Sequence, residues 1–244
     1  MIRTESRSAA DAAAFDRHLD EWEASLTSRP MPEIVRKAGG AERIGVFCVD
    51  LLNGFCHEGL LRSDGVRAII PAIVSLFRGA YAEGVRHFVL PQDCHPPDAV
   101  EFTAFPPHCI RGTAEADTVP ELATLPFADR FTVLPKRSLH PAIGTGLAAW
   151  LADHPEVTHR IVVGDCTDLC VYQLAMHLKL SANAENVDRP VIVPEDCVAT
   201  YDLPIDDAAE VGAYAHPARH LHRVFLYHMA LNGVNVVRSI PGAA

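Results

Sequence analysis

The chain has 244 residues, of which 49% are apolar, and its formal net charge is -10 at pH 7. This size and composition suffice for one large domain with a buried core, and the acidic balance argues against non-specific binding to nucleic acid or acidic membranes. No run approaches the roughly 18 apolar residues of a membrane span, and residues 1–7 are not followed by the apolar stretch of a secretory signal.

The seven cysteines are an odd number, which is unusual for a secreted protein that pairs its cysteines. Most of them lie in apolar, strand-like surroundings, where a free thiol packs as a small hydrophobic side chain. Unpaired thiols persist in a reducing compartment, so this pattern predicts a cytoplasmic protein.

The N-terminal region predicts an amphipathic helix over residues 8–27, because apolar side chains recur there at steps of four, three and four. These side chains are Phe15, Leu19, Trp22 and Leu26. Pro30 and Pro32 follow and break the pattern. We expect residues 1–40 to form a helical arm, either packed on the body or on another subunit or solvated on the surface, and residues 41–244 to form the main domain.

From residue 44 onward, short apolar strands alternate with helices. Strands are predicted at 44–49, 87–90, 131–134, 160–163, 191–193 and 234–237, and helices at 66–77, 145–152, 171–178 and 214–231. This alternation predicts a three-layer α/β/α fold whose central sheet is mainly parallel. The long proline-rich interval 91–130 is typical of a functional loop.

Chemically useful side chains stand where the predicted strands end. Asp50 ends the first strand, Asp93 and His95 follow the second, Lys136 follows the third, and Cys170 lies shortly after the fourth. Ligands of open parallel sheets bind beyond the carboxyl ends of the strands, so we expect these residues to meet at one edge.

Cys170 is a candidate nucleophile, because it stands where a loop enters a helix and the helix dipole favours a thiolate. Asp50 is suited to take the thiol proton, Lys136 to stabilise negative charge, and the backbone N–H groups of Cys166 and Cys170 to form an oxyanion hole. Each residue also has a structural interpretation: Asp50 as a turn cap, Lys136 as a solvated side chain and Cys170 as a core residue.

The long loop carries a candidate metal site. Asp93 and His95 are two residues apart, and Glu101 and His108 are the next suitable ligands. Carboxylate and imidazole donors suit zinc, iron or manganese.

The sequence from about residue 44 to the C-terminus resembles the isochorismatase-like cysteine hydrolases. The resemblance rests on an apolar strand ending in Asp50 with Asn53 and Phe55 after it, on Lys136 after an apolar strand, and on the motif Gly-x-x-Thr-Asp-x-Cys-Val that ends at Cys170 and Val171. Within that family, the segments 92–97 and 105–113 look like the segment that holds the metal in nicotinamidases, and the C-terminal stretch 215–240 looks similar to plant-type nicotinamidases.

The resemblance implies an isochorismatase-like, Rossmann-like fold and a nicotinamidase that hydrolyses nicotinamide to nicotinate and ammonia through a thioester on Cys170. It implies a cis peptide before Cys166, whose N–H joins that of Cys170 in the oxyanion hole. It also implies a metal, zinc before iron or manganese, that orients the substrate. Its ligands would be Asp93, His95, His108 and, less firmly, Glu101, and the substrate ring would lie between Phe55 and Phe105.

Two departures from the family pattern concern the substrate and the oxyanion hole. Asp165-Cys166 stands where small apolar residues are more usual, and Cys94 stands in place of an aromatic residue. Alternatives therefore remain: hydrolysis of another small amide or carbamoyl compound, a metal-hydroxide hydrolase with a structural Cys170, or a non-catalytic binding protein. The expected partners are a small amide and further copies of the chain, as a homo-oligomer.

Overall fold

The computed structural model describes residues 9–242. Residues 1–8 and 243–244 lie outside the described residues, and with them the expectation about a secretory signal and the start of the helix predicted from residue 8. The domain boundary predicted between residues 40 and 41 stays a prediction.

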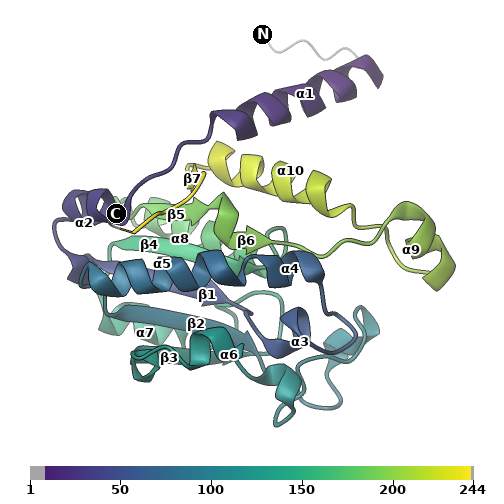
Figure 1. Cartoon of the computed structure of the whole chain (residues 1–244), viewed down its shortest axis with the longest axis horizontal. Helices are drawn as coiled ribbons and strands as arrows, with labels where there is room; N and C mark the ends of the chain where they lie inside the picture. The colour runs from purple at the N-terminus through teal and green to yellow at the C-terminus, as the bar shows by residue number, and fades with distance from the viewer. Residues whose placement is uncertain (1–8, 243–244) are drawn as a thin grey trace.

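A parallel sheet forms the centre of the molecule (Figure 1). Its strands are β1 (Ile44–Val49), β2 (His87–Asp93), β3 (Phe131–Lys136), β4 (His159–Asp165), β5 (Val191–Pro194), β6 (Val198–Ala199) and β7 (Asn235–Val237). Within the described chain the order is β3-β2-β1-β4-β5-β7, with β6 paired to β4, and every pairing is parallel. The predicted α/β fold with a mainly parallel sheet is thereby confirmed.

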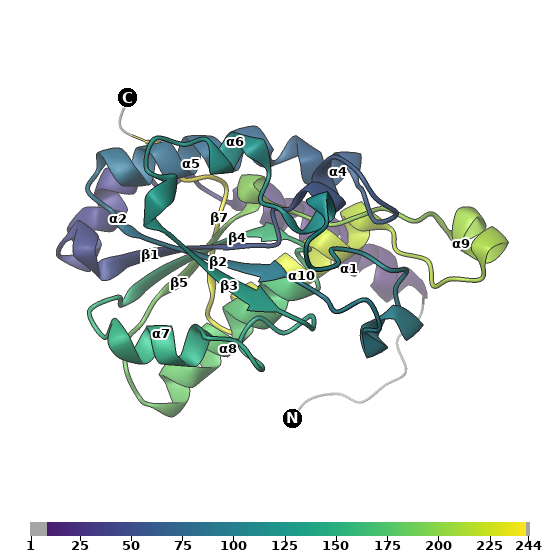
Figure 2. The same ribbon diagram turned by 90° about the horizontal axis from the view of Figure 1, so that it is seen from below.

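Helices cover both faces of this sheet, as Figure 2 shows. They are α1 (Ala9–Ser25), α2 (Met31–Ala38), α3 (Asn53–Cys56), α4 (Asp64–Ala68), α5 (Ile70–Ala82), α6 (Pro120–Ala123), α7 (Leu147–Asp153), α8 (Cys170–Ala184), α9 (Ile205–Val211) and α10 (Ala218–Leu231). The core cluster on one face includes residues of α2, α5 and α6, and the cluster on the other face includes residues of α7, α8 and α10.

Strand β1 illustrates why its sequence is continuously apolar. Val46 and Cys48 belong to the core cluster on one face, whereas Phe47 and Val49 belong to the cluster on the other. Successive side chains of a strand point to opposite faces, so a strand covered on both sides needs an apolar residue at every position.

Helices α4 and α5 together form a run that is apolar and long enough to cross a membrane by length and composition, over 19 residues from Asp64 to Ala82. The sequence had predicted no run long enough for a membrane span. In the structure, Ile70, Ile73 and Phe77 of α5 are buried in the core cluster beside the sheet. This packing accounts for the hydropathy of the run.

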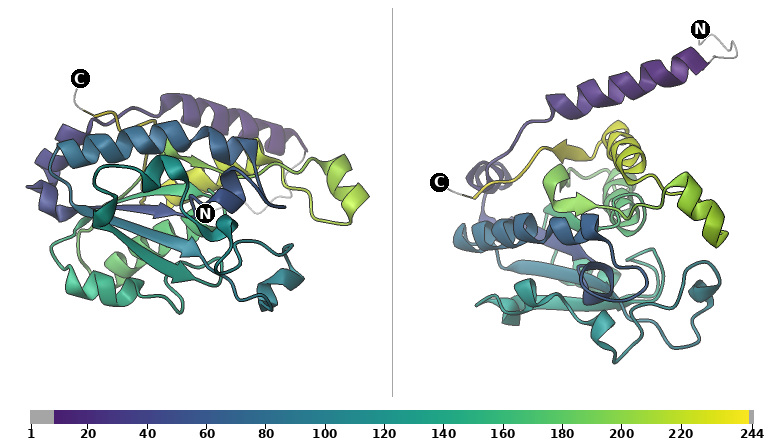
Figure 3. Two further views of the ribbon diagram at one scale, coloured as in Figure 1. Left: turned by 60° about the horizontal axis from the view of Figure 1, so that its bottom comes forward. Right: turned by 45° about the vertical axis from the view of Figure 1, so that its right-hand side comes forward.

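The predicted N-terminal arm divides into two helices. Helix α1 lies along α10 and away from the sheet (Figures 1 and 3). Trp22 of α1 packs edge-on against Tyr227 of α10 with ring centroids 5.2 Å apart, and Asp20 forms an ion pair with Arg223. Helix α2, in contrast, places Met31 and Ile34 in the main core.

The C-terminal region differs most from the prediction. The helix predicted over 214–231 begins only at Ala218, because Pro217 precedes it and His216 pairs through its backbone with Leu203. The intervening segment contains α9, which projects from the body in Figures 1 and 3. Strand β6 and helices α2 and α9 were missed, since two residues of strand and helices of seven and eight residues give little periodicity.

Candidate active site

The carboxyl ends of four neighbouring strands meet at one edge of the sheet. Asp93, Lys136 and Asp165 are the last residues of β2, β3 and β4, and Asp50 directly follows β1. Asp93 and Lys136 are also register partners across β2 and β3. Strand β1 has the predicted bounds, whereas β2, β3 and β4 end two or three residues later than predicted. The side chains converge as the parallel-sheet argument expected.

Asp50, Asp93 and Lys136 form a buried ionic cluster. The Nζ atom of Lys136 lies 2.7 Å from Oδ2 of Asp50 and 2.7 Å from Oδ1 of Asp93. The backbone N–H of Asp93 donates a 2.8 Å hydrogen bond to Oδ1 of Asp50. Asp50 has a φ of 54°, a left-handed conformation that Asp tolerates better than most residues, and this turns the chain at the end of β1.

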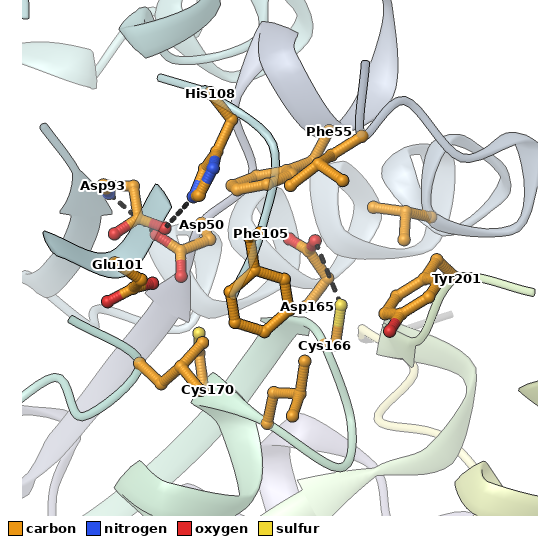
Figure 4. A pocket seen from close by; sticks show the side chains of 14 residues that line it. Asp50, Phe55, Asp93, Glu101, Phe105, His108, Asp165, Cys166, Cys170 and Tyr201 are labelled. Carbon is orange, nitrogen blue, oxygen red and sulfur yellow. Dashed lines mark hydrogen bonds and ion pairs between the residues drawn. The ribbon is translucent and has the colours of Figure 1, made fainter. Parts of the chain in front are cut away.

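Cys170 is the first residue of α8, and its thiol faces the ionic cluster. Its Sγ lies 3.5 Å from Nζ of Lys136, which donates to it. The side chain is 5% exposed and lines a cavity together with Asp50 and Asp93 (Figure 4). The N-terminus of α8 and the ammonium group of Lys136 both favour a negative charge on the sulfur.

The pKa shifts in the cluster leave a protonated thiol beside its candidate base. Burial raises the pKa of the Cys170 thiol, and Lys136 opposes this shift, so the resting thiol keeps its proton. Burial, with the charge of Asp93 beside it, raises the pKa of Asp50 to about 7, while Lys136 acts in the opposite direction. Burial disfavours the ammonium form of Lys136, but the charges of Asp50 and Asp93 raise its pKa above its ordinary value. A carboxyl group with a pKa near neutrality can both accept and return a proton.

The turn between β4 and α8 supplies two backbone N–H groups beside the thiol. The peptide bond between Asp165 and Cys166 is cis. Gly164 precedes it at a φ of 111°, where a Cβ atom would lie 2.0 Å from the carbonyl oxygen of Val49. Within residues 9–242, no hydrogen-bond acceptor occupies the N–H of Cys166 or of Cys170. Two unoccupied donors next to a nucleophile are suited to hold an oxyanion.

Asp93, His95 and His108 form a buried group that could hold a metal ion, since each offers a ligand atom and these atoms lie within 4.8 Å of one another. His95 is fully buried; its Nε2 lies 3.0 Å from Oδ1 of Asp93, and its Nδ1 has no hydrogen-bond partner among the described residues. Nδ1 of His108 donates a 2.8 Å hydrogen bond to the carbonyl oxygen of Pro106, so in the neutral ring the lone pair is on Nε2. This Nε2 lies 3.8 Å from Oδ2 of Asp93. Such a tautomer is that of a metal-bound imidazole, so these residues fit a divalent transition metal.

The long loop reaches this site because its two halves pair. His95 and Ile110 form a β-bridge, in which the N–H of His95 donates to Cys109 and the N–H of Arg111 donates back to His95. This pairing returns His108 to the end of β2. Glu101 lines the same cavity, and its Oε1 is buried without a hydrogen-bond partner in the described part of the chain. The carboxylate of Glu101 does not belong to the group of close ligand atoms that Asp93, His95 and His108 form.

Aromatic side chains line the cavity, whose volume is about 490 Å³ with the open solvent at its mouth included (Figure 4). Phe55 and Phe105 each contact the ring of His108, with centroids 5.6 and 6.4 Å apart. Flat apolar walls of this kind suit a planar ring. Tyr201 also lines the cavity, near Cys166.

Tyr201 is a cavity residue that the sequence patterns did not predict. Its ring stacks on His216 with centroids 3.8 Å apart, and Nε2 of His216 lies 2.7 Å from Oδ2 of Asp168 in the turn before Cys170. Thr200 donates to the other oxygen of Asp168 at 2.6 Å. Tyr201 stands just beyond β6, so the strand-end rule would have found it had that two-residue strand been recognised.

Comparison with known proteins identifies the family. Residues 45–221 match the profile of the isochorismatase domain. The chain belongs to the isochorismatase family. Its three-layer fold and its resemblance to that family, both predicted from the sequence, are confirmed.

Several members of the isochorismatase family are similar over most of the chain. Nicotinamidase 1 of Arabidopsis thaliana is 31% identical over 214 residues, which cover 81% of this chain and 86% of that protein. The nicotinamidase/pyrazinamidase of Mycobacterium tuberculosis is 34% identical over 140 residues, covering 52% and 74%. The crystal structure of a nicotinamidase from Bacillus subtilis has a TM-score of 0.61 and 25% identity, covering 80% of this chain and 99% of that one.

Other structures of the family share the fold. The pyrazinamidase of Pyrococcus horikoshii, solved in complex with zinc, has a TM-score of 0.61 and 20% identity over 80% of this chain and 99% of that one. The N-carbamoylsarcosine amidase of Thermoplasma acidophilum has a TM-score of 0.59 and 22% identity over 80% and 96%. Taken with the nicotinamidase relatives, the family membership identifies the chain as an amidohydrolase of the isochorismatase type.

Proposed function

We propose that the chain is a nicotinamidase, which hydrolyses nicotinamide to nicotinate and ammonia with Cys170 as its nucleophile. The observation that carries this proposal is the position of Lys136, whose Nζ contacts Asp50, Asp93 and Cys170 and so joins an acid–base group, a metal-ligating residue and a thiol in one buried cavity. A structural cysteine has no need of such neighbours. The similarity to nicotinamidases supports the choice of substrate.

In the proposed reaction, the Cys170 thiol gives its proton to Asp50 and the sulfur attacks the carboxamide carbon. The free N–H groups of Cys166 and Cys170 hold the resulting oxyanion. Ammonia leaves with the proton from Asp50, and a thioester remains on the sulfur. Asp50 then takes a proton from water, whose hydroxide displaces the thiolate, and the proton returns to sulfur. Nicotinic acid departs and ionises in solution to nicotinate. Lys136 stabilises the anionic groups throughout.

Asp93, His95 and His108 would hold a divalent metal, with zinc the first choice for two imidazoles and a carboxylate. Glu101 is a further proposed ligand, because its buried Oε1 lacks another partner among the described residues. The bound metal would supply a Lewis-acidic contact that orients the ring nitrogen of the substrate. Phe55 and Phe105 would hold the ring by stacking.

The test is the release of ammonia from nicotinamide, with benzamide as the matched control substrate. Benzamide keeps the flat ring and the carboxamide and lacks only the ring nitrogen. An orienting contact kept through the reaction fixes the attack geometry, and we expect kcat/KM to be about a hundredfold higher for nicotinamide. Equal values for both amides would show that nothing contacts the ring nitrogen, and would favour the alternative, a hydrolase of other small amides or carbamoyl compounds.

A further inference from the structure

A second cavity lies between α7 and α8, on the side of the sheet that these helices cover. It is lined by Ala148 and Leu151 of α7, by His177 and Ser181 of α8, and by Arg160 and Arg189, and it encloses about 840 Å³ of space that includes open solvent. None of its lining residues lines the cavity of Cys170. Arg160 stands near the start of β4, five residues and roughly 17 Å of strand before Asp165.

Arg160 is a buried cation without a counter-ion. The residue is 4% exposed, and its Nε is shielded from solvent without a hydrogen-bond partner. Among residues 9–242, no carboxylate oxygen lies within 4.0 Å of its guanidinium, whereas six other lysine and arginine side chains in that range form such ion pairs. An unpaired buried charge is costly, so native proteins pair such groups or bind an ion there.

The groups around Arg160 favour an anion. Arg189 stands at the same cavity and forms a 2.5 Å ion pair with Glu185, which also lines it. Burial and the neighbouring Arg189 lower the pKa of Arg160 to about 10, so the guanidinium is still charged at neutral pH. The hydroxyl of Ser181 and the imidazole of His177 are further donors at the cavity. Ala148 and Leu151 make the opposite wall apolar.

We propose that this cavity is a binding site for a small oxyanion, a phosphate or a carboxylate, whose oxygens pair with the guanidinium of Arg160. A guanidinium presents a planar fork of N–H donors that matches both groups. The apolar wall of α7 leaves room for a short hydrocarbon portion beside the charged group. The site does not depend on the reaction catalysed at Cys170.

Thermal unfolding in a chloride buffer free of oxyanions tests the site. The probes are inorganic phosphate and propanoate. For each probe, the Tm is compared with the Tm in sodium chloride of equal ionic strength. A ligand that binds only the folded chain stabilises it, and at a large excess over Kd we expect the wild-type Tm to rise by roughly 5 °C. The probe with the larger rise at equal concentration identifies the preferred oxyanion. No rise with either probe would overturn the proposal.

Arg160→Met is the decisive variant, because it replaces the buried cation with an apolar chain of similar length. We expect it to lose the ligand-dependent rise, while its Tm in chloride equals or exceeds that of the wild type since an unpaired charge is removed. Arg36→Gln, on an exposed arginine of α2, should keep the full rise. An unchanged rise in Arg160→Met would show that the anion binds elsewhere.

Arg160→Lys and Arg189→Gln keep the proposal testable if Arg160→Met does not fold. Lysine retains the charge but loses the fork, so the probe concentration needed for half the rise should increase at least tenfold. Arg189 is at the rim, and its loss should increase that concentration severalfold. Wild-type titration curves in both variants would contradict the assignment.

Discussion

The ammonium group of Lys136 lies 2.7 Å from Oδ2 of Asp50, and both side chains are fully buried. The same ammonium group contacts Asp93 at 2.7 Å and the Cys170 sulfur at 3.5 Å. One cation therefore balances two carboxylates, and in the proposed reaction it would also stabilise negative charge on the sulfur. A buried pair of this kind is weak evidence for stability, whereas its position beside the Cys170 sulfur supports the proposed reaction.

We expect Cys170→Ala to abolish amide hydrolysis and leave the fold intact, because loss of a covalent nucleophile costs several orders of magnitude in kcat. Steady-state ammonia release and circular dichroism measure the two effects. Cys197→Ala is the matched control, since Cys197 is also buried but lies outside the cavity. A Cys170→Ala enzyme with more than about a tenth of the wild-type kcat would rule out thioester chemistry.

Asp50→Asn should lower kcat by about a hundredfold or more, since the amide cannot accept the thiol proton. Its Tm should change little. Asparagine tolerates the left-handed φ of residue 50, its oxygen can still accept from the N–H of Asp93, and Lys136 keeps its ion pair with Asp93. Differential scanning calorimetry beside kinetics separates the two quantities. Normal kcat with a large loss of Tm would identify Asp50 as a structural cap instead.

Purified protein should contain one transition metal in the active site, and its removal should lower both Tm and activity. His108→Ala should lose this metal, and Glu101→Gln should weaken its retention less. His154→Ala is the control, because His87, His154 and Glu156 are a second group of ligand atoms within 4.8 Å of one another. Elemental analysis and Tm with and without chelator measure these effects. Metal lost from His154→Ala but kept in His108→Ala would place it at the second group.

Stability should depend on pH through His216 and Asp168. Burial alone would lower the pKa of His216, but its hydrogen bond with Asp168 raises it above the ordinary value. The imidazolium therefore stabilises the fold fully below its unfolded pKa of about 6.5, and this contribution is lost as pH rises through the raised folded value. Burial raises the pKa of Asp168, but His216 and Thr200 lower it overall, so the carboxylate remains charged at pH 5.5.

Urea unfolding of wild type and His216→Gln at pH 5.5 and 8.5 measures this dependence. We expect the wild type to be more stable by about 1–2 kcal/mol at pH 5.5, with a smaller difference at pH 8.5. His220→Gln, on an exposed histidine of α10, should show no such change. The same difference at both pH values would mean that His216 acts through stacking on Tyr201 alone.

The sequence predicted the inner strands well because β1, β2, β4 and β5 are buried on both faces and so have apolar runs. The strand ends also predicted that Asp50, Asp93, Lys136 and Cys170 lie at one edge of the sheet. This prediction does not depend on loop conformation, because the carboxyl ends of parallel strands meet at the same edge. It did not predict Tyr201, whose place depends on a two-residue strand, or its contact with His216, which is 15 residues away along the chain. Nor did it predict the unpaired state of Arg160, because pairing is decided by tertiary contacts.

The strand order has a consequence for any partly folded form of the chain. Asp93, Lys136, Asp50 and Asp165 stand on or directly after β2, β3, β1 and β4, which are neighbours in the sheet but span residues 44–165 in sequence. Cys170 follows only after the last of these. No N-terminal fragment that stops before α8 can assemble the site, so catalysis during synthesis or unfolding reports completion of the whole sheet edge rather than of any local unit.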